Sequence, residues 1–284
     1  MSNFWVRTIW GIVYAVTVIC ALVYGGIWGQ LSLAFIISIF CMLEFLTLRN
    51  CNHTLDLVFG VALNLMVIML NHYTPEMMGL VFTKSDFSQI IFTLILLFIM
   101  VYWGIALYKY GTQAIEKVTP VIFGLVYISL PCLLFLEISN NWKYPLLVFV
   151  LTWSSDTFAY LVGRLIGKRP LYEALSPKKT MEGFVGGILL TGVTGAIFAY
   201  YMNFLPIEGF MLGALVSVAG TAGDLFESAI KRQAGVKDSG RFLPGHGGAL
   251  DRFDAFLFAS VVVYSWFYLV HSSLVYVFWG SNIP

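Results

Sequence analysis

The stretch SAIKRQAGVKDSGRFLPGHGGALDRFD, residues 228–254, is the polar centre of this chain. It is rich in charged residues and glycines, and it lies between two apolar runs at about 209–227 and 253–271. Apolar runs of about 20 residues are long enough to cross a membrane as helices. A charged block between two such runs predicts chemistry at a membrane surface.

The rest of the chain is mostly apolar. Its 284 residues are 59% hydrophobic and 11% charged, whereas soluble domains carry about 25% charged residues. Because lipid offers the backbone no hydrogen-bond partners, spans must be helices or barrel strands, and unbroken apolar runs favour helices. Seven further apolar runs lie at about 9–25, 31–48, 55–74, 88–108, 119–138, 144–163 and 183–204.

These nine runs predict an all-α, polytopic membrane protein with about nine transmembrane helices. We expect one membrane-integral domain over residues 1–284, with N-terminal spans in 1–118 and the catalytic motifs in 119–284. The first half has few polar residues within its spans, and we interpret Glu44, Asn64 and Asn71 as interhelical hydrogen-bond partners or end-of-span residues.

The lysines and arginines predict the orientation. With the N-terminus inside the cell, only Lys84 and Lys143 fall outside, and the other 14 of the 16 basic residues fall inside. The polar loops expected at 164–182 and 228–252 then share the cytoplasmic side. The net charge of +1 provides no field that would attract nucleic acid.

Other site types are excluded by spacing. The four cysteines form no CxxC pair and the four histidines are scattered, so no zinc pattern is present. The segment GRLIGKR at 163–169 lacks the spacing of a phosphate-binding P-loop. Neither GxSxG nor HExxH occurs.

Carboxylates stand at helical spacing on both sides of the polar block. Asp224 and Glu227 are three residues apart at the end of one apolar run, and Asp251 and Asp254 are three apart at the start of the next. Mg²⁺ prefers oxygen ligands and usually binds one or two carboxylates together with substrate phosphates. The basic residues between the runs suit phosphate oxygens. The glycines of PGHGG, residues 244–248, could bring backbone N–H groups against an anion. This combination predicts phosphoryl or nucleotidyl transfer.

Two upstream segments add polar residues. Asp156 lies inside an apolar run within WSSDTFAY, residues 153–160, and a carboxylate at such a position is a functional candidate. In SPKKTMEGFVGG, residues 176–187, Thr180 is expected to cap the helix that follows. The small residues of that helix, among them Gly183, Gly192 and Gly195, predict close helix packing.

The polar block resembles the signature of the phosphatidate cytidylyltransferases, the CDP-diacylglycerol synthases. That signature reads S-x-x-K-R-x4-K-D-x-[GSA]-x2-[apolar]-[PG]-x-H-G-G-x-x-D-R-x-D. The matching residues are Ser228, Lys231, Arg232, Lys237, Asp238, Gly240, Leu243, Pro244, His246, Gly247, Gly248, Asp251, Arg252 and Asp254. The segments 176–187 and 153–160 resemble two further stretches of the same family, so the resemblance covers about 150–260.

The resemblance implies transfer of a cytidylyl group from CTP to phosphatidic acid by an all-helical, dimeric enzyme of the bacterial cytoplasmic membrane. It implies Mg²⁺, alone or with a second cation, bound by Asp224 and Asp251 in a cavity open to the cytoplasm. The implied catalytic residues are Asp224, Asp251, Asp254 and Lys237. The implied substrate-binding residues are Asp156, Ser176, Lys179, Thr180, Ser228, Lys231, Arg232, Asp238, His246 and Arg252.

Two other classes of protein remain open from the residues. An ion- or proton-coupled transporter would also carry intramembrane carboxylates, but we expect its polar residues throughout the membrane depth. A structural protein that binds anionic lipids would explain the lysines and arginines, and it would tolerate Asp to Asn at positions 224 and 251.

Overall fold

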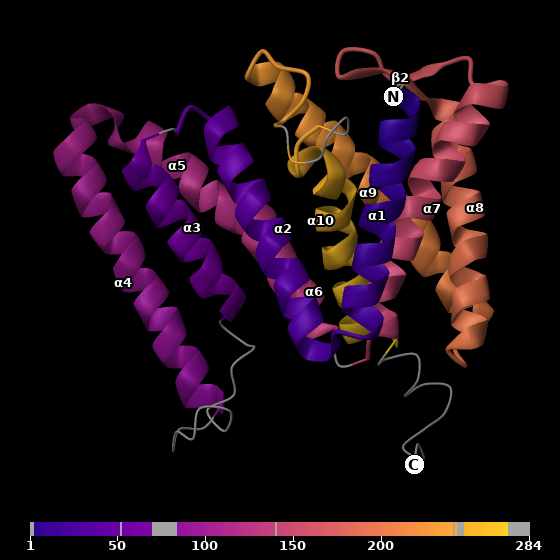
Figure 1. Cartoon of the computed structure of the whole chain (residues 1–284), viewed down its shortest axis with the longest axis horizontal. Helices are drawn as coiled ribbons and strands as arrows, with labels where there is room; N and C mark the ends of the chain where they lie inside the picture. Colours follow the sequence, from indigo (N-terminus) through magenta and orange to yellow (C-terminus); the bar gives the residue numbers. More distant parts are fainter. Residues whose placement is uncertain are drawn as a thin grey trace. The chain divides into compact units, whose positions relative to one another are not determined.

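The computed structural model describes residues 3–51, 53–69, 84–139, 141–240, 242 and 247–271, and nearly all of them are helical (Figure 1). The first half contains α1 (Asn3–Val23), α2 (Gly26–Leu48), α3 (Thr54–Met69), α4 (Lys84–Tyr110), the 3-10 turn η2 (Gly111–Gln113), α5 (Ala114–Gly124), the π-helical turn η3 (Leu125–Ser129) and α6 (Leu130–Glu137). The second half contains α7 (Lys143–Ile166), α8 (Met181–Tyr201), α9 (Pro206–Gln233), α10 (Leu250–Ser265) and the π-helical turn η4 (Trp266–His271).

Within the described residues, every predicted apolar run lies largely on a helix, which confirms the all-α, polytopic class. Within the described residues, six helical segments are long and apolar enough to cross a membrane: 26–48, 89–137, 143–166, 181–201, 206–233 and 250–269. The segments 9–23 and 54–69 are apolar but shorter. The segment 89–137 joins α4 to α6 through the turn at Gly111, whose φ is 54°. The count of nine spans therefore stays a prediction.

The two expected polar loops are shorter than predicted. The stretch 164–182 contains an antiparallel hairpin of β1 (Pro170–Tyr172) and β2 (Ser176–Thr180). The stretch 228–252 begins as helix, because α9 continues to Gln233. Its last turn carries Lys231 and Arg232, which interact favourably with the negative end of the helix dipole. The helix ends just before Gly235, whose φ of 71° suits a helix terminus.

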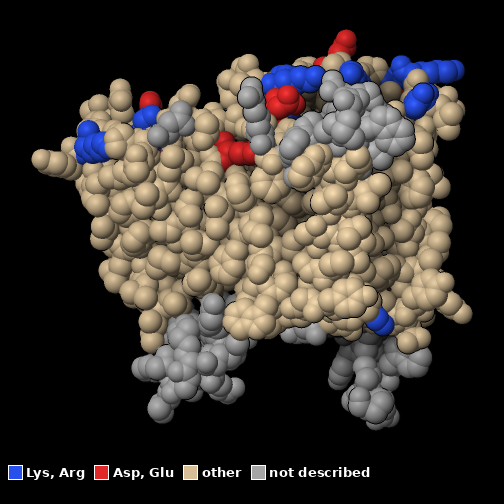
Figure 2. Space-filling model, viewed as in Figure 1, with Lys and Arg blue, Asp and Glu red and all other residues tan. Residues whose placement is uncertain are grey.

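The chain forms two compact units. Unit 1 comprises residues 1–139 and 234–253, and unit 2 comprises residues 140–233 and 254–284. Each unit is described by itself below, and the single domain over 1–284 stays a prediction. In both units, charged side chains on the visible face gather near helix ends, whereas the surface along the helices is uncharged (Figure 2).

The core of unit 1 contains a buried polar link between three helical segments. The Asn64 side-chain amide in α3 donates to Ser38 Oγ in α2 over 3.1 Å. The Ser129 hydroxyl in η3 donates to Asn64 Oδ1 over 2.6 Å. This confirms Asn64 as an interhelical hydrogen-bond partner, while Asn71 lies outside the described residues.

In unit 2, glycines allow α8 to pack closely against α7 and α9. A Cβ added at Gly183 would lie 2.6 Å from the backbone oxygen of Ala159 in α7. A Cβ added at Gly195 would lie 2.1 Å from the backbone oxygen of Gly209 in α9. Both distances are shorter than any real Cβ contact, so the predicted close packing of this helix is confirmed.

Candidate active site

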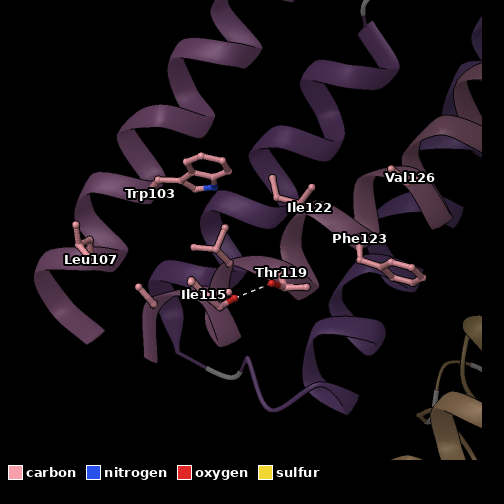
Figure 3. Close-up of a pocket in the computed structure, with 9 residues that line it drawn as sticks. Trp103, Leu107, Ile115, Thr119, Ile122, Phe123 and Val126 are labelled. Carbon is pink, nitrogen blue, oxygen red and sulfur yellow. Dashed lines mark hydrogen bonds between the residues drawn. The ribbon is translucent and has the colours of Figure 1, made fainter. Parts of the chain in front are cut away.

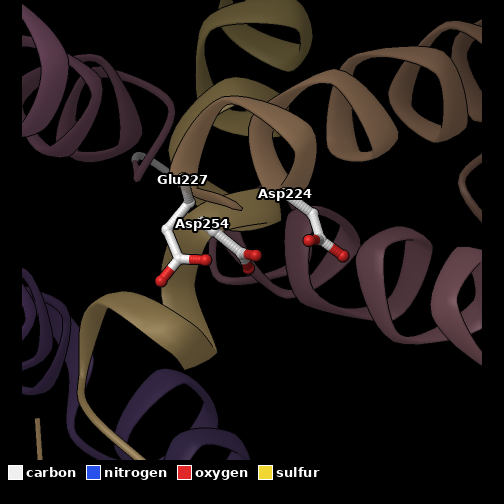
Figure 4. A group of neighbouring side chains, drawn as sticks. All are labelled: Asp224, Glu227 and Asp254. Atoms are coloured by element: carbon white, nitrogen blue, oxygen red, sulfur yellow. The ribbon is translucent and has the colours of Figure 1, made fainter. Parts of the chain in front are cut away.

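An acidic group lies where α9 and α10 approach each other in unit 2 (Figure 4). It consists of Asp224 and Glu227 from α9 and Asp254 from α10, whose carboxylate oxygens lie within 4.8 Å of one another. The helices can meet this closely because position 223 is glycine. A Cβ at Gly223 would lie 2.5 Å from the backbone oxygen of Asp254. A small residue at position 223 is therefore needed to bring Asp254 to the two carboxylates of α9.

Two lysines accompany the acidic group. Lys179, at the end of β2, forms an ion pair with Asp224. Lys231 Nζ lies 2.5 Å from Glu227 Oε2, one helical turn along α9. Three carboxylates this close repel one another, and the two ammonium groups offset part of that repulsion. A cluster of carboxylate oxygens is also the donor set that a hard divalent cation prefers, so these residues fit Mg²⁺.

Glu227 is the member of this group that the sequence-based prediction did not include among the site residues. Glu227 is fully buried, with 0% of its surface exposed. The signal was present, because Glu227 stands three residues after Asp224 and therefore on the same helix face. A second neighbour, Ser228, was predicted, and its hydroxyl lies 3.4 Å from Asp224 Oδ1.

A cavity of about 450 Å³ adjoins Asp224 within unit 2. It is lined by residues from three parts of unit 2. Asp156 comes from α7, Asp224 comes from α9, and β2 contributes Ser176, Lys179 and Thr180. Further lining side chains include Ser155, Tyr160, Arg164, Lys178 and Thr221. The fold therefore gathers five sequence-predicted site residues around one polar space.

Thr180 connects the hairpin to α8. Its Oγ1 accepts a hydrogen bond from the Gly183 N–H over 3.1 Å, which confirms the predicted helix cap. Only glycine at position 167 leaves room for the Thr180 hydroxyl, because a Cβ at Gly167 would lie 2.6 Å from Thr180 Oγ1. The cap therefore fixes the end of β2, and with it Lys179, against the start of α8.

In unit 1, Asp251, the second residue of α10, holds described parts of the polar block that lie between α9 and α10. Asp251 Oδ2 accepts hydrogen bonds from the Ser239 N–H over 2.8 Å and from the Gly248 N–H over 2.8 Å, and it lies 3.1 Å from the Ser239 hydroxyl oxygen. Gly247 has a φ of 81°, and its Cβ would lie 2.6 Å from Asp251 Oδ2. One of these glycines, Gly248, presents its backbone N–H to the carboxylate of Asp251, and binding of a substrate anion by the PGHGG segment stays a prediction.

Glu44 of α2 holds the same loop from the N-terminal half of the chain. Its carboxylate accepts hydrogen bonds from the Ser239 hydroxyl over 2.7 Å, from the Ala249 N–H over 2.9 Å and from the Leu250 N–H over 2.9 Å. The last two groups lie at the start of α10, where backbone N–H groups lack intrahelical acceptors. A negative charge is also stabilised at a helix N-terminus. Glu44 is therefore the interhelical partner that the sequence predicted, and it also positions the motif loop.

Replacement of Glu44 by Gln is expected to destabilise the protein. Gln offers one acceptor oxygen, and its NH₂ group faces hydrogen-bond donors, so at least one of the three donors loses its acceptor. A buried donor without a partner costs about 1–3 kcal/mol. Thermal unfolding in detergent should show a lower midpoint for Glu44→Gln than for Glu116→Gln, a matched change at an exposed residue of unit 1. Equal midpoints for the two variants would contradict this role of Glu44.

The remaining predicted residues lie on the surface or outside the description. Lys237, Asp238 and Arg252 are exposed in unit 1, and Arg232 is exposed in unit 2. His246 lies outside the described residues. The structure thus brings Asp224, Asp254, Lys179, Lys231 and Ser228 together in unit 2, whereas Asp251 and Lys237 belong to unit 1.

Known proteins resemble this chain. The sequence model of the cytidylyltransferase family matches residues 5–270. A phosphatidate cytidylyltransferase of Bacillus subtilis (strain 168) is 43% identical over 161 residues, which are 54% of this chain and 60% of the relative. A phosphatidate cytidylyltransferase of Staphylococcus aureus (strain COL) is 42% identical over 140 residues, 48% of this chain and 54% of the relative. The chain therefore spans little more than half the length of the curated relatives it matches.

Proposed function

The chain belongs to the cytidylyltransferase family, and on that premise we propose that it transfers CMP from CTP to phosphatidic acid. The products are CDP-diacylglycerol and pyrophosphate. The observation that carries the proposal is the acidic group with its two lysines beside a polar cavity. The similarity to phosphatidate cytidylyltransferases of Bacillus subtilis and Staphylococcus aureus supports the same substrates.

The chemistry needs charge neutralisation more than it needs a base. A phosphate oxygen of phosphatidic acid, already anionic, attacks the α-phosphorus of CTP. The new P–O bond forms as the bond to pyrophosphate breaks, so no proton has to be removed from the nucleophile. The obstacles are repulsion between two anions and the charge on the departing pyrophosphate. Lys179 and Lys231 stand beside the acidic group and would neutralise phosphate oxygens.

We propose Mg²⁺, alone or with a second cation, as the cofactor. Its ligands would be Asp224, which the acidic group supports, and Asp251, which the family resemblance supports. Asp254 and Glu227 would complete the negative environment of Asp224. A bound divalent cation would supply positive charge to the phosphates of CTP.

The proposed setting is the bacterial cytoplasmic membrane, with the cavity facing the cytoplasm and the N-terminus inside. The supporting observation is the basic character of the cavity wall, which contains Arg164, Lys178 and Lys179. Cytoplasmic segments of membrane proteins carry an excess of lysine and arginine. At this place water-soluble CTP and membrane-held phosphatidic acid can meet. A homodimer is proposed from the family resemblance alone.

Lys237→Met is expected to lower the rate of cytidylyl transfer strongly. We propose that the exposed ammonium group of Lys237 binds a substrate phosphate, and hydrogen bonds to charged groups contribute about 1.5–3 kcal/mol. That loss corresponds to about 10- to 100-fold in kcat/KM. Lys143→Met, at the start of α7 and predicted to lie on the opposite side of the membrane, is the control. A similar loss in both variants would indicate general destabilisation and would remove the assigned role.

A labelled nucleotide distinguishes the proposed reaction from transport, because only the reaction transfers the label to the lipid. Purified protein in vesicles is incubated with Mg²⁺, phosphatidic acid and CTP labelled in the cytosine ring. An enzyme moves the label into the lipid fraction, whereas a transporter moves an ion and leaves the label in water. Label that stays entirely in the aqueous fraction would argue against the proposed function.

A further inference from the structure

An apolar groove in unit 1 contrasts with the polar cavity of unit 2 (Figure 3). It has a volume of about 690 Å³ and runs between α4 and α5. Its lining includes Thr119, whose hydroxyl donates to the Ile115 carbonyl over 2.7 Å. Within the described part of the chain, no charged side chain lines this groove. The cavity of unit 2, which Lys178 and Lys179 line, offers a nucleotide phosphate the charges that the groove lacks.

The hairpin of β1 and β2 forms one wall of the cavity of unit 2. Lys179, near the end of β2, pairs with Asp224 of α9. The hairpin residues that line the cavity are Leu171, Ser176, Lys178, Lys179 and Thr180. Because the proposed reaction places Lys179 against phosphate oxygens, the position of the hairpin decides where that charge lies.

Glu182, in the first turn of α8, holds the base of this hairpin. Its Oε2 accepts hydrogen bonds from the backbone N–H of Lys168 over 3.0 Å and from that of Arg169 over 3.2 Å. Its Oε1 accepts a hydrogen bond from Arg169 Nε over 3.0 Å. Both backbone N–H groups belong to the two residues just before β1. One carboxylate therefore joins the chain that enters the hairpin to the start of the next helix.

The chain that leaves the hairpin is fixed at the same place. Pro170 pairs with Thr180 across the two strands, and Thr180 caps α8. Glu182 follows two residues later and binds the backbone before β1. Lys179 directly precedes Thr180, so a shift of the hairpin base would move the Lys179 ammonium group relative to Asp224.

The hydrogen bonds from the backbone matter more here than the ion pair with Arg169. The Arg169 side chain is 78% exposed, and exposed ion pairs contribute little to stability. The two backbone N–H groups donate to an ionised acceptor, and such hydrogen bonds are about twice as strong as those between neutral groups. The main effect of the Glu182 carboxylate is therefore to fix the backbone at residues 168 and 169.

We propose that Glu182 is a positioning residue for the reaction in this cavity, an inference that rests on the proposed function. Glu182 is not among the described residues that line the cavity. It acts through the hairpin, by keeping Lys179 where it meets both Asp224 and the substrate phosphates. Its contribution is the acceptor oxygen that it offers to the backbone, and its negative charge is secondary.

Two substitutions at position 182 separate the acceptor from the charge. Glu182→Leu keeps a side chain of similar size and removes both acceptor oxygens. It should lower kcat/KM for CTP by about tenfold, because a misplaced catalytic group costs up to about 100-fold. Glu182→Gln loses the charge and keeps an oxygen that can accept from both backbone N–H groups, so its loss should stay below about threefold. Glu173→Leu, in the exposed turn of the hairpin, is the matched control and should leave kcat/KM unchanged.

Two further measurements distinguish positioning from general damage to the protein. In the Lys179→Met background, Glu182→Leu should cost less than about twofold more, because the charge that it positions is already absent. Hydrogen exchange, measured without substrate on the peptide that contains Lys168 and Arg169, should be at least about tenfold faster in Glu182→Leu than in the unchanged protein.

Four results would overturn the proposed role of Glu182. They are near-normal kcat/KM in Glu182→Leu, an equal loss in Glu182→Gln and Glu182→Leu, a full additional loss in the Lys179→Met background, and unchanged hydrogen exchange at residues 168 and 169. Failure of the proposed function would look different. The unchanged protein would then form no CDP-diacylglycerol, while faster exchange in Glu182→Leu would still support the hold of Glu182 on the hairpin.

Discussion

Asp224→Asn is expected to abolish CTP-dependent formation of CDP-diacylglycerol while expression and thermal stability stay close to those of the unchanged protein. Asn keeps the size of the side chain and loses the charge that would hold a divalent cation. It also removes the ion pair with Lys179. Loss of one electrostatic stabiliser in an active site lowers kcat by about 10²–10³-fold, and loss of a proposed metal ligand should reach at least that range.

The Asp224→Asn and Asp251→Asn double variant should be no worse than either single variant, because the proposed metal site would need both ligands. Glu173→Gln, an exposed change in the turn of the hairpin, is the matched control. Asp56 is unsuitable as a control because its buried carboxylate accepts hydrogen bonds from Tyr102 and Tyr110. Near-normal turnover of Asp224→Asn at low Mg²⁺ would contradict the proposed metal site.

The second large effect is expected at Lys179, which lies in the cavity and pairs with Asp224. Lys179→Met removes a charge that the proposed reaction places against phosphate oxygens. It also leaves the three carboxylates with one lysine fewer to offset their repulsion. We expect kcat/KM for CTP to fall by about 10²-fold, the upper part of the range for a lost charged hydrogen bond.

Arginine at position 179 separates charge from other contributions of the side chain. Lys179→Arg should restore part of the activity, because it keeps the charge although its geometry differs. Lys168→Met, an exposed change just before the hairpin, should leave turnover unchanged. If Lys179→Met and Lys168→Met behaved alike, Lys179 would have no particular part in the reaction.

The features that the sequence predicted correctly depend on neighbours along the chain. The helix cap at Thr180 follows from a local pattern, and its hydrogen bond to Gly183 spans three residues. The shared face of Asp224 and Glu227 follows from the period of the helix. The membrane helices could be predicted from apolar runs, because a segment that crosses lipid must be long and largely uncharged.

The features that escaped prediction depend on contacts between distant residues or on weak local preferences. Glu44 and Ser239 are 195 residues apart, and no spacing rule connects them. The strand Ser176–Thr180 has the sequence SPKKT, which lacks the alternation of apolar residues that marks a strand. The end of α9 looked like a loop because it is polar, although Ala229, Lys231 and Arg232 are good helix formers.

The most direct test of the central claim uses the purified, unchanged protein with CTP, phosphatidic acid and Mg²⁺, and it measures both products in the same sample. The account predicts pyrophosphate and CDP-diacylglycerol in equal amounts, with neither formed when phosphatidic acid or CTP is omitted. Folded protein that forms no CDP-diacylglycerol, or that releases pyrophosphate without any lipid product, would contradict it.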